Sequence, residues 1–321
     1  MPAEQNKTIA VKSAGPGTPS HGRTKAILQA LLVTLLWSSS WIIIKLGLGD
    51  VPPLTLAGLR FFLAFLCLLP FARRQLRSGQ LKAAGRNLWL EILGLGVLYY
   101  AIIPGGQNLG LKLLPANTLS LIISFSAVLV ALLGAAFLRE KPSWLQWAGM
   151  ALSLLGVVVY FRAAGQVSFS TAGLAAGLVT MTANAFASIM GRKLNHGGAI
   201  SPLLLTVLSM AVGAVLILGV GLAMEGLPHL TTLQWLLILW LAVVNTAFAY
   251  QLWNKTLVEL PALESVLINN TMLAQIAILA WVFLGEKLTA LQVIGLVASL
   301  VGVVVVQLRG RQTRTDSNTE S

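Results

Sequence analysis

The sequence is poor in charged residues, which make up only 10% of its 321 positions. Soluble domains carry about 25% charged residues, so this deficit argues against water as the solvent of the folded chain. Hydrophobic residues occupy 56% of the positions, and a soluble fold of this length could not bury so much apolar surface. The low charge therefore predicts a protein that folds in a lipid bilayer.

Cysteine and histidine are also scarce. Cys67 is the sole cysteine, which excludes a disulfide framework and a cysteine-based metal site and leaves a packing role for this residue. The three histidines, His21, His196 and His229, fall in the N-terminal segment or in connections, and none has a partner at metal-ligand spacing. The sequence contains no GxxxxGK[ST] segment, so we do not expect ATP hydrolysis. No metal and no cofactor are expected.

Ten apolar runs follow one another along the chain, and each is about 20 residues long, enough to cross a bilayer as a helix. The runs are 26–47, 53–72, 88–110, 115–138, 143–162, 171–190, 201–223, 232–255, 261–284 and 289–308. Proline, glycine or charged residues mark most of the joints between them. The predicted fold class is an all-α polytopic membrane protein with ten transmembrane helices.

The basic residues predict the orientation of these helices. The net charge is +12, and lysine and arginine are enriched in cytoplasmic loops. If the N-terminus is cytoplasmic, 17 of the 22 basic residues fall on the cytoplasmic side. Both termini are therefore predicted to be cytoplasmic, with residues 1–25 a disordered tail, residues 309–321 a second tail, and the first apolar run retained as a helix.

A repeat with a shift of 146 residues divides the chain into two halves. Segments 137–160 and 283–306 are identical at 13 of 24 positions, including Glu140-Lys141 and Glu286-Lys287. Each half holds five runs, an odd number, so the second half must enter the membrane from the opposite side. The sequence thus predicts an inverted-topology repeat, with halves 26–162 and 171–308, as in many secondary transporters.

Several segments together resemble the EamA family of the drug/metabolite transporter superfamily. They are "LLWSSSWIIIKLGL", "LRFFLAFLCLLP", "FLREKPSWLQWAGMALSLLGVVVY" and "FLGEKLTALQVIGLVASLVGVVVV". The resemblance covers residues 26–308. It implies a ten-helix basket whose central cavity is lined mainly by the first, third, fourth, sixth, eighth and ninth helices. Many members carry a proline within the fourth and ninth helices, and the corresponding segments here, "SLIISFSAVLVALLG" and "SVLINNTMLAQIAIL", lack it.

Polar side chains in the first span are candidates for the substrate site, because such groups deep in lipid usually face a cavity or another helix. In "WSSSW", Trp37 and Trp41 share a helix face at i and i+4, and Ser40 adds a hydroxyl. This segment is either a cavity wall or a close helix contact through small residues. Lys45, one turn further on, either extends to the membrane surface or attracts an anionic substrate group.

The third span contains "YYAIIPGGQNLG", in which Pro104, Gly105 and Gly106 should interrupt the helix. Interrupted helices often form binding sites in transporters. Tyr99 and Gln107 are the substrate-site candidates in this span.

The second half supplies the remaining candidates. The ninth span holds the densest polar patch of any run, with Asn270, Thr271 and Gln275. Asn245 and Tyr250 in the eighth span and Asn184 in the sixth are further substrate-site candidates. Glu264 is either a proton-coupling carboxylate or an interfacial charge.

Three charged sites lie near the ends of spans. Arg60 is either an anchor of the second span at the outer interface, the favoured interpretation, or a ligand for the substrate. The Glu140-Lys141 and Glu286-Lys287 turns are expected to hold helix ends at opposite membrane faces.

These observations favour a secondary transporter that exports an amino acid or related metabolite across the inner membrane by alternating access. Efflux of drugs or toxic compounds, or uptake of a metabolite, are the alternatives. An intramembrane enzyme is disfavoured because the spans carry no histidine and few acidic residues. The expected partners are a small-molecule substrate and the bilayer and not nucleic acid, while a homodimer is left open.

Overall fold

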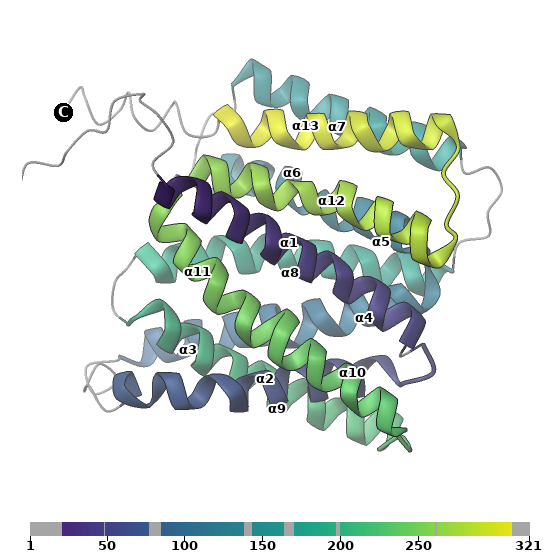
Figure 1. Ribbon diagram of the computed structural model, residues 1–321. Coiled ribbons are helices and arrows are strands. Elements are labelled where there is room, and N and C mark those ends of the chain that lie inside the picture. The colour runs from purple at the N-terminus through teal and green to yellow at the C-terminus, as the bar shows by residue number, and fades with distance from the viewer. Residues whose placement is uncertain are drawn as a thin grey trace, which may run out of the picture.

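The computed structural model describes residues 21–47, 49–76, 85–137, 143–163, 170–196, 200–260 and 262–309. Every regular element within these ranges is a helix (Figure 1). The α-helices are α1 (His21–Gly47), α2 (Pro53–Leu76), α3 (Arg86–Gly96), α4 (Ile103–Leu113), α5 (Ala116–Ser124), α6 (Ser126–Phe137), α7 (Trp144–Ala163), α8 (Thr171–His196), α9 (Pro202–Glu225), α10 (Thr232–Ala242), α11 (Ala249–Glu259), α12 (Ala262–Leu284) and α13 (Ala290–Arg309). Two π-helical segments, η1 (Val97–Ile102) and η2 (Val243–Phe248), join α3 to α4 and α10 to α11.

The helix bounds follow the apolar runs closely. Helix α1 begins at His21, five residues before the predicted start of the first apolar run at Ala26, and residues 1–20 lie outside the described ranges. Seven helical runs of the described chain are long and apolar enough to cross a membrane. Three further runs form shorter apolar helices, Ala116–Val130, Ile268–Leu284 and Ala290–Val305.

The outer surface carries large apolar side chains, and small residues make the helix contacts. Helix α7 exposes Trp144 and Leu155 while it buries Gly149 and Ser153. This distribution is the reverse of that in a soluble protein. It suits a helix that faces lipid tails and packs through small residues. The chain is therefore a polytopic membrane protein.

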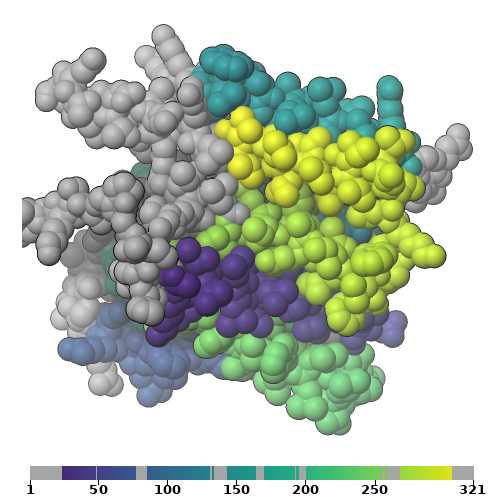
Figure 2. All heavy atoms as spheres, turned by 45° about the horizontal axis from the view of Figure 1, so that its top comes forward, coloured from purple at the N-terminus to yellow at the C-terminus, as the bar shows by residue number. Residues whose placement is uncertain are grey.

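The helices pack in pairs across the molecule. Helices α7 and α13 lie side by side at one edge, α2 and α9 pack together at the opposite edge, and the pairs α1–α12 and α4–α8 lie between them (Figure 1). In Figure 2, α7 (teal) and α13 (yellow) form the upper part of the visible surface. Residues at the middle of the bundle therefore come from both halves of the chain.

The α7–α13 contact is reciprocal with respect to the 146-residue shift. The Oγ atoms of Ser153 and Ser299 lie 3.3 Å apart at its centre. On one side of this pair, a Cβ on Gly156 would be 2.5 Å from the Gly295 carbonyl oxygen; on the other, a Cβ on Gly149 would be 2.9 Å from that of Gly302. Gly156 thus faces Gly295, the repeat counterpart of Gly149. Gly149 faces Gly302, the repeat counterpart of Gly156.

Two of the apolar runs are interrupted, one far from any proline and the other just before Pro104. The fourth apolar run is divided at Phe125 into α5 and α6, although its only proline, Pro115, lies at its start. In the third run, the irregular stretch is η1, and Pro104 follows it in the first turn of α4. Pro104 has no backbone N–H to donate. The π-helical segment η1 ends at Ile102, just before this residue.

The second π-helical segment occupies the repeat-equivalent place. Segment η2 spans Val243–Phe248, and subtraction of 146 from these numbers gives Val97–Ile102, the bounds of η1. No proline follows η2 closely. Because π-helical turns are rare and often occur at functional sites, this pair of segments directs attention to the residues around them.

Candidate functional site

The two π-helical segments lie at the centres of their helical runs, since each is flanked by two α-helices of 11 residues. Aromatic and polar side chains gather around them from α1, α2 and α11. We refer to this set as the central cluster, and its members are Trp37, Arg60, Tyr99, Tyr100, Asn245, Thr246, Tyr250 and Trp253.

Aromatic rings from both halves of the chain are in contact in the central cluster. The Trp37 ring centroid lies 5.5 Å from that of Tyr250 and 5.3 Å from that of Trp253. Tyr100 lies 5.1 Å from Tyr99 and 6.4 Å from Tyr250. The side chains of Tyr99 and Tyr250 also interact with each other. These rings offer flat apolar faces together with hydroxyl groups.

Arg60 contributes a positive charge to the cluster, and it is not the outer-interface anchor that the sequence suggested. Its side chain is buried, with a residue exposure of 8%. Its Nε donates a 2.9 Å hydrogen bond to Thr246 Oγ1, and Thr246 Oγ1 in turn donates to the carbonyl of Leu241, 2.8 Å away. A cation inside an apolar bundle is costly and usually marks a functional position.

Asn245, the neighbour of Thr246 on η2, is fully buried. Its Nδ2 donates to the backbone carbonyl of Leu36 and to Ser39 Oγ, at 3.2 Å in the latter case. Its Oδ1 is buried and has no hydrogen-bond partner among the described residues. Because the amide nitrogen faces two acceptors on α1, the oxygen must point elsewhere, and a buried acceptor of this kind calls for a donor.

A second polar set joins α1 to α12. Gln275 Nε2 donates to Thr34 Oγ1 at 3.1 Å and to Thr271 Oγ1 at 3.0 Å, and its Oε1 accepts from Ser38 Oγ at 3.0 Å. Two predicted site residues, Thr271 and Gln275, are thus brought together with the serine-rich segment of α1. The contact is made by Ser38 and not by Ser40, whose hydroxyl donates to the Trp37 carbonyl at 2.6 Å.

Other predicted site residues lie apart from these contacts. Trp41 is buried in an apolar cluster with Ile44 and Leu114. Asn184 accepts a hydrogen bond through its backbone carbonyl from Ser188 on its own helix. Gln107 on α4 and Asn270 on α12 are half-buried. The side chain of Glu264 lies outside the described residues. In the described part of the chain, no three His, Cys, Asp or Glu side chains are grouped to hold a metal ion.

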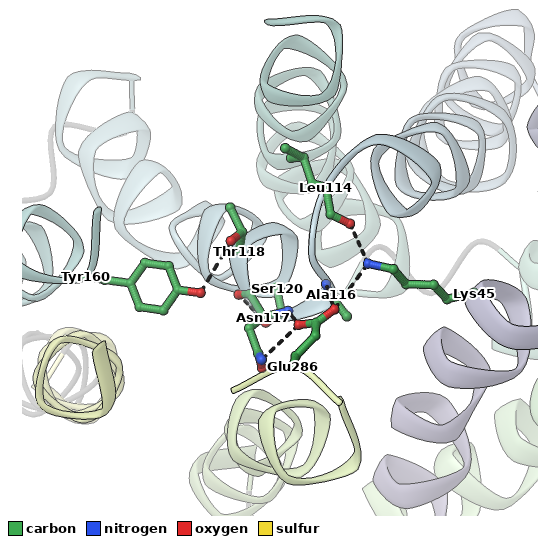
Figure 3. A network of polar contacts seen from close by, with 8 residues as sticks. All are labelled: Lys45, Leu114, Ala116, Asn117, Thr118, Ser120, Tyr160 and Glu286. Carbon is green, nitrogen blue, oxygen red and sulfur yellow. Dashed lines mark hydrogen bonds and ion pairs between the residues drawn. The ribbon is translucent and has the colours of Figure 1, made fainter. Parts of the chain in front are cut away.

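The Glu286-Lys287 turn forms a polar network instead of only holding a helix end at the interface (Figure 3). Glu286 accepts from the backbone N–H of Ala116 at 2.7 Å and from that of Asn117 at 3.2 Å, which places a carboxylate at the start of α5. It also pairs with Lys45 Nζ at 3.1 Å, and Lys45 donates to the Leu114 carbonyl at 2.7 Å. Lys45 therefore ties α1 to the joint between α4 and α5 and to the α12–α13 turn.

Comparison with known proteins adds to this geometry. The model of the EamA-like transporter family matches residues 24–162 and again residues 171–308. A protein of Salmonella typhimurium named "Probable amino-acid metabolite efflux pump" is 31% identical over 301 residues, which cover 89% of this chain and 96% of that protein. A protein of Escherichia coli with the same name is 30% identical over 291 residues, covering 86% and 92% of the two chains. A solved crystal structure with 19% identity superposes with a TM-score of 0.62, covers 90% of this chain and 97% of its own, and has the same fold.

Proposed function

Because the chain belongs to the EamA-like transporter family, we propose that it exports an amino acid or a related metabolite by alternating access. The chain is a multi-pass protein of the cell (inner) membrane with a small-molecule substrate. Its family is one of transporters, and transporters are not a class of enzyme. The relatives named as amino-acid metabolite efflux pumps support the choice of substrate class and of direction.

One observation carries this proposal: the central cluster combines a buried cation, amide and hydroxyl groups, and aromatic rings in one place. Trp37, Arg60 and Tyr99 come from the first half of the chain, and Thr246 and Tyr250 come from the second. An amino acid presents a carboxylate, an ammonium group and a side chain, and the cluster offers a complementary partner to each of them. Its place between the two halves suits a binding site that is opened to each side in turn.

The proposed architecture is that of ten membrane spans arranged as two inverted five-helix repeats, 26–162 and 171–308, with both termini cytoplasmic. Three observations support it. The family model matches the chain twice, the α7–α13 contact relates repeat-equivalent positions reciprocally, and η1 and η2 occupy equivalent positions. The two halves would rock about the central cluster, and the helices would bend at the π-helical segments.

Reconstitution of the full-length chain tests the proposal. Liposomes are loaded with an equimolar mixture of the twenty amino acids, and mass spectrometry measures which of them leave, against protein-free liposomes. We expect selective release of one amino acid or of a chemically related group. Release of none of the twenty, with transport of lipophilic drugs instead, would establish the chain as a drug efflux permease.

Direction is tested separately in intact cells that express the chain. For an exporter, the amino acid identified in liposomes accumulates in the medium and its internal concentration falls, relative to cells that carry the empty vector. Net accumulation inside the cells would instead identify an uptake permease.

A further inference from the structure

Arg60 carries a buried charge that pairs with no carboxylate among the described residues. The residue lies in the apolar interior of the bundle with an exposure of 8%, and its Nε is bound to the neutral hydroxyl of Thr246 at 2.9 Å. In the part of the chain that the structure describes, no carboxylate lies within ion-pair distance of Arg60. A buried cation of this kind requires an anion or is strongly destabilising.

The hydrogen bond to Thr246 orients the guanidinium in a defined way. The Thr246 hydroxyl donates to the Leu241 carbonyl, five residues earlier, so its oxygen is held in place to accept from Arg60 Nε. This contact uses one of the five N–H groups of arginine. The two terminal amino groups form the fork that binds a carboxylate through two parallel hydrogen bonds.

The neighbouring residue provides an independent second observation. Asn245 Oδ1 is a buried acceptor with no partner in the described ranges, and the hydrogen bonds of Nδ2 to Leu36 and Ser39 fix the orientation of the amide. Asn245 and Thr246 are consecutive on η2, so the unfilled acceptor and the oriented cation are held by the same π-helical segment. A ligand that fills both would carry an anionic group for Arg60 and a hydrogen-bond donor for Asn245 Oδ1.

We infer that Arg60 binds the α-carboxylate of the transported amino acid and that Asn245 Oδ1 accepts a hydrogen bond from its α-ammonium group. The rings of Trp37 and Tyr250, which are in contact with each other, then form a surface for the side chain of the substrate. This assignment rests on the proposed function. It adds that the site selects free, zwitterionic α-amino acids and discriminates against amines, amides and keto acids.

The test compares three probes in proteoliposomes that contain the full-length chain. They are the amino acid that the wild type releases from the twenty-component mixture, its α-carboxamide, and the corresponding 2-oxo acid. The carboxamide keeps the ammonium group and lacks the carboxylate, whereas the 2-oxo acid keeps the carboxylate and lacks the ammonium group. Each analogue therefore removes one half of the proposed recognition.

For the wild type we expect the amino acid to be transported about tenfold to a hundredfold better than either analogue, the range for a hydrogen-bonded charged group. Arg60→Gln should abolish the preference for the amino acid over the carboxamide and leave the preference over the 2-oxo acid. Asn245→Ala should do the opposite, so each variant serves as the control for the other. Arg60→Lys keeps the charge but not the planar fork and should retain part of the preference.

The outcomes separate this inference from the proposed function. If the wild type moves an amino acid and Arg60→Gln leaves the acid-to-amide ratio unchanged, the inference is overturned and the proposed function stands. If Arg60→Gln does not give a monodisperse protein, the ratio of Arg60→Lys decides, and a ratio equal to that of the wild type overturns the inference. If the wild type moves none of the twenty amino acids, the proposed function fails and the inference fails with it.

Discussion

Two tryptophans one turn apart on α1 illustrate how neighbouring residues of one motif can differ in role. Trp37 is half-buried and contacts Tyr250 and Trp253 in the central cluster. Trp41 has an exposure of 6% and is surrounded by apolar residues of other helices, among them Leu56 and Leu241. The spacing in "WSSSW" predicts that both rings share a helix face. Only the packed structure shows that Trp37 contacts the central cluster and that Trp41 lies in the apolar core.

Replacement of each tryptophan by alanine should therefore give opposite results. Trp41→Ala should lower the free energy of unfolding by about 3–5 kcal/mol, because it leaves a large cavity. Trp37→Ala should change the order in which amino acids are transported, with a smaller loss of stability. Thermal melting in detergent and transport of the amino-acid mixture measure the two effects. Equal melting temperatures for the two variants would contradict the separation.

Arg60 and Asn245 mark the limit of prediction at this scale. Asn245 is polar inside an apolar run and was recognised for that reason. Arg60 stands near the start of its run, where an interface anchor and a buried ligand-binding group have the same sequence signature. Only the hydrogen bond to Thr246, 186 positions away in the chain, shows that Arg60 points into the bundle.

Glu264 is the candidate for proton coupling, and its replacement should change only the response of transport to a pH gradient. If this carboxylate carries the proton, Glu264→Gln should abolish the stimulation of transport by an imposed pH gradient and leave exchange of internal for external amino acid intact. Transport of the labelled amino acid with and without the gradient measures this difference. Full stimulation in the variant would exclude Glu264 from coupling. Glu91→Gln, which removes another carboxylate, is the control.

At the scale of elements, η1 packs closely against the backbone of α9. Gly213 of α9 packs against η1 so tightly that an added Cβ would be 2.5 Å from the Cβ of Tyr100. Gly96, just before η1, similarly packs against the Ser209 carbonyl, with 2.5 Å to an added Cβ. These contacts lie between segments more than 100 residues apart, so no local sequence pattern predicts the exact extent of η1.

Gly213→Ala should disturb the central cluster through Tyr100. We expect a loss of about 1–3 kcal/mol in stability from overpacking, together with reduced transport. Gly219→Ala on the same helix is the matched control, because an added Cβ there has no neighbour within 4 Å. Alanine is favoured over glycine in a helix by about 1 kcal/mol, so this control should be neutral or slightly stabilising. Similar melting temperatures for both variants would argue against the packing role of Gly213.

The Glu286 network makes a different prediction, about a helix terminus. Glu286→Gln should destabilise the protein by about 2 kcal/mol, because the charged group bonded to two N–H groups of α5 and to Lys45 is lost. Glu91→Gln is the control for an ion pair alone, because its partner Lys193 has a side-chain exposure of 72%. Exposed pairs contribute about 0–1 kcal/mol. Melting temperatures of the two variants measure the difference, and equal shifts would show that capping of α5 contributes little.

At the scale of the whole molecule, the sequence predicts the helices better than their contacts. The predicted run 53–72 corresponds to α2, Pro53–Leu76, and the predicted run 261–284 corresponds to α12, Ala262–Leu284. Apolar length is a local property, so these bounds are accurate to a few residues. The division at Phe125 and the capping of α5 by Glu286 arise from contacts between distant segments, which periodicity does not encode.

The inverted arrangement of the two halves is the prediction with the widest consequence, since alternating access about the central cluster depends on it. Trp144 and Ala290 are the first residues of α7 and α13, both are exposed, and their numbers differ by the repeat shift of 146. In a Cys67→Ala background, Trp144→Cys and Ala290→Cys should therefore lie at opposite membrane faces. A membrane-impermeant thiol reagent applied to intact cells should label Ala290→Cys at once and Trp144→Cys only after permeabilisation. Labelling of both from the same side would overturn the inverted repeat, and with it the rocking of two equivalent halves about Arg60 and Tyr250.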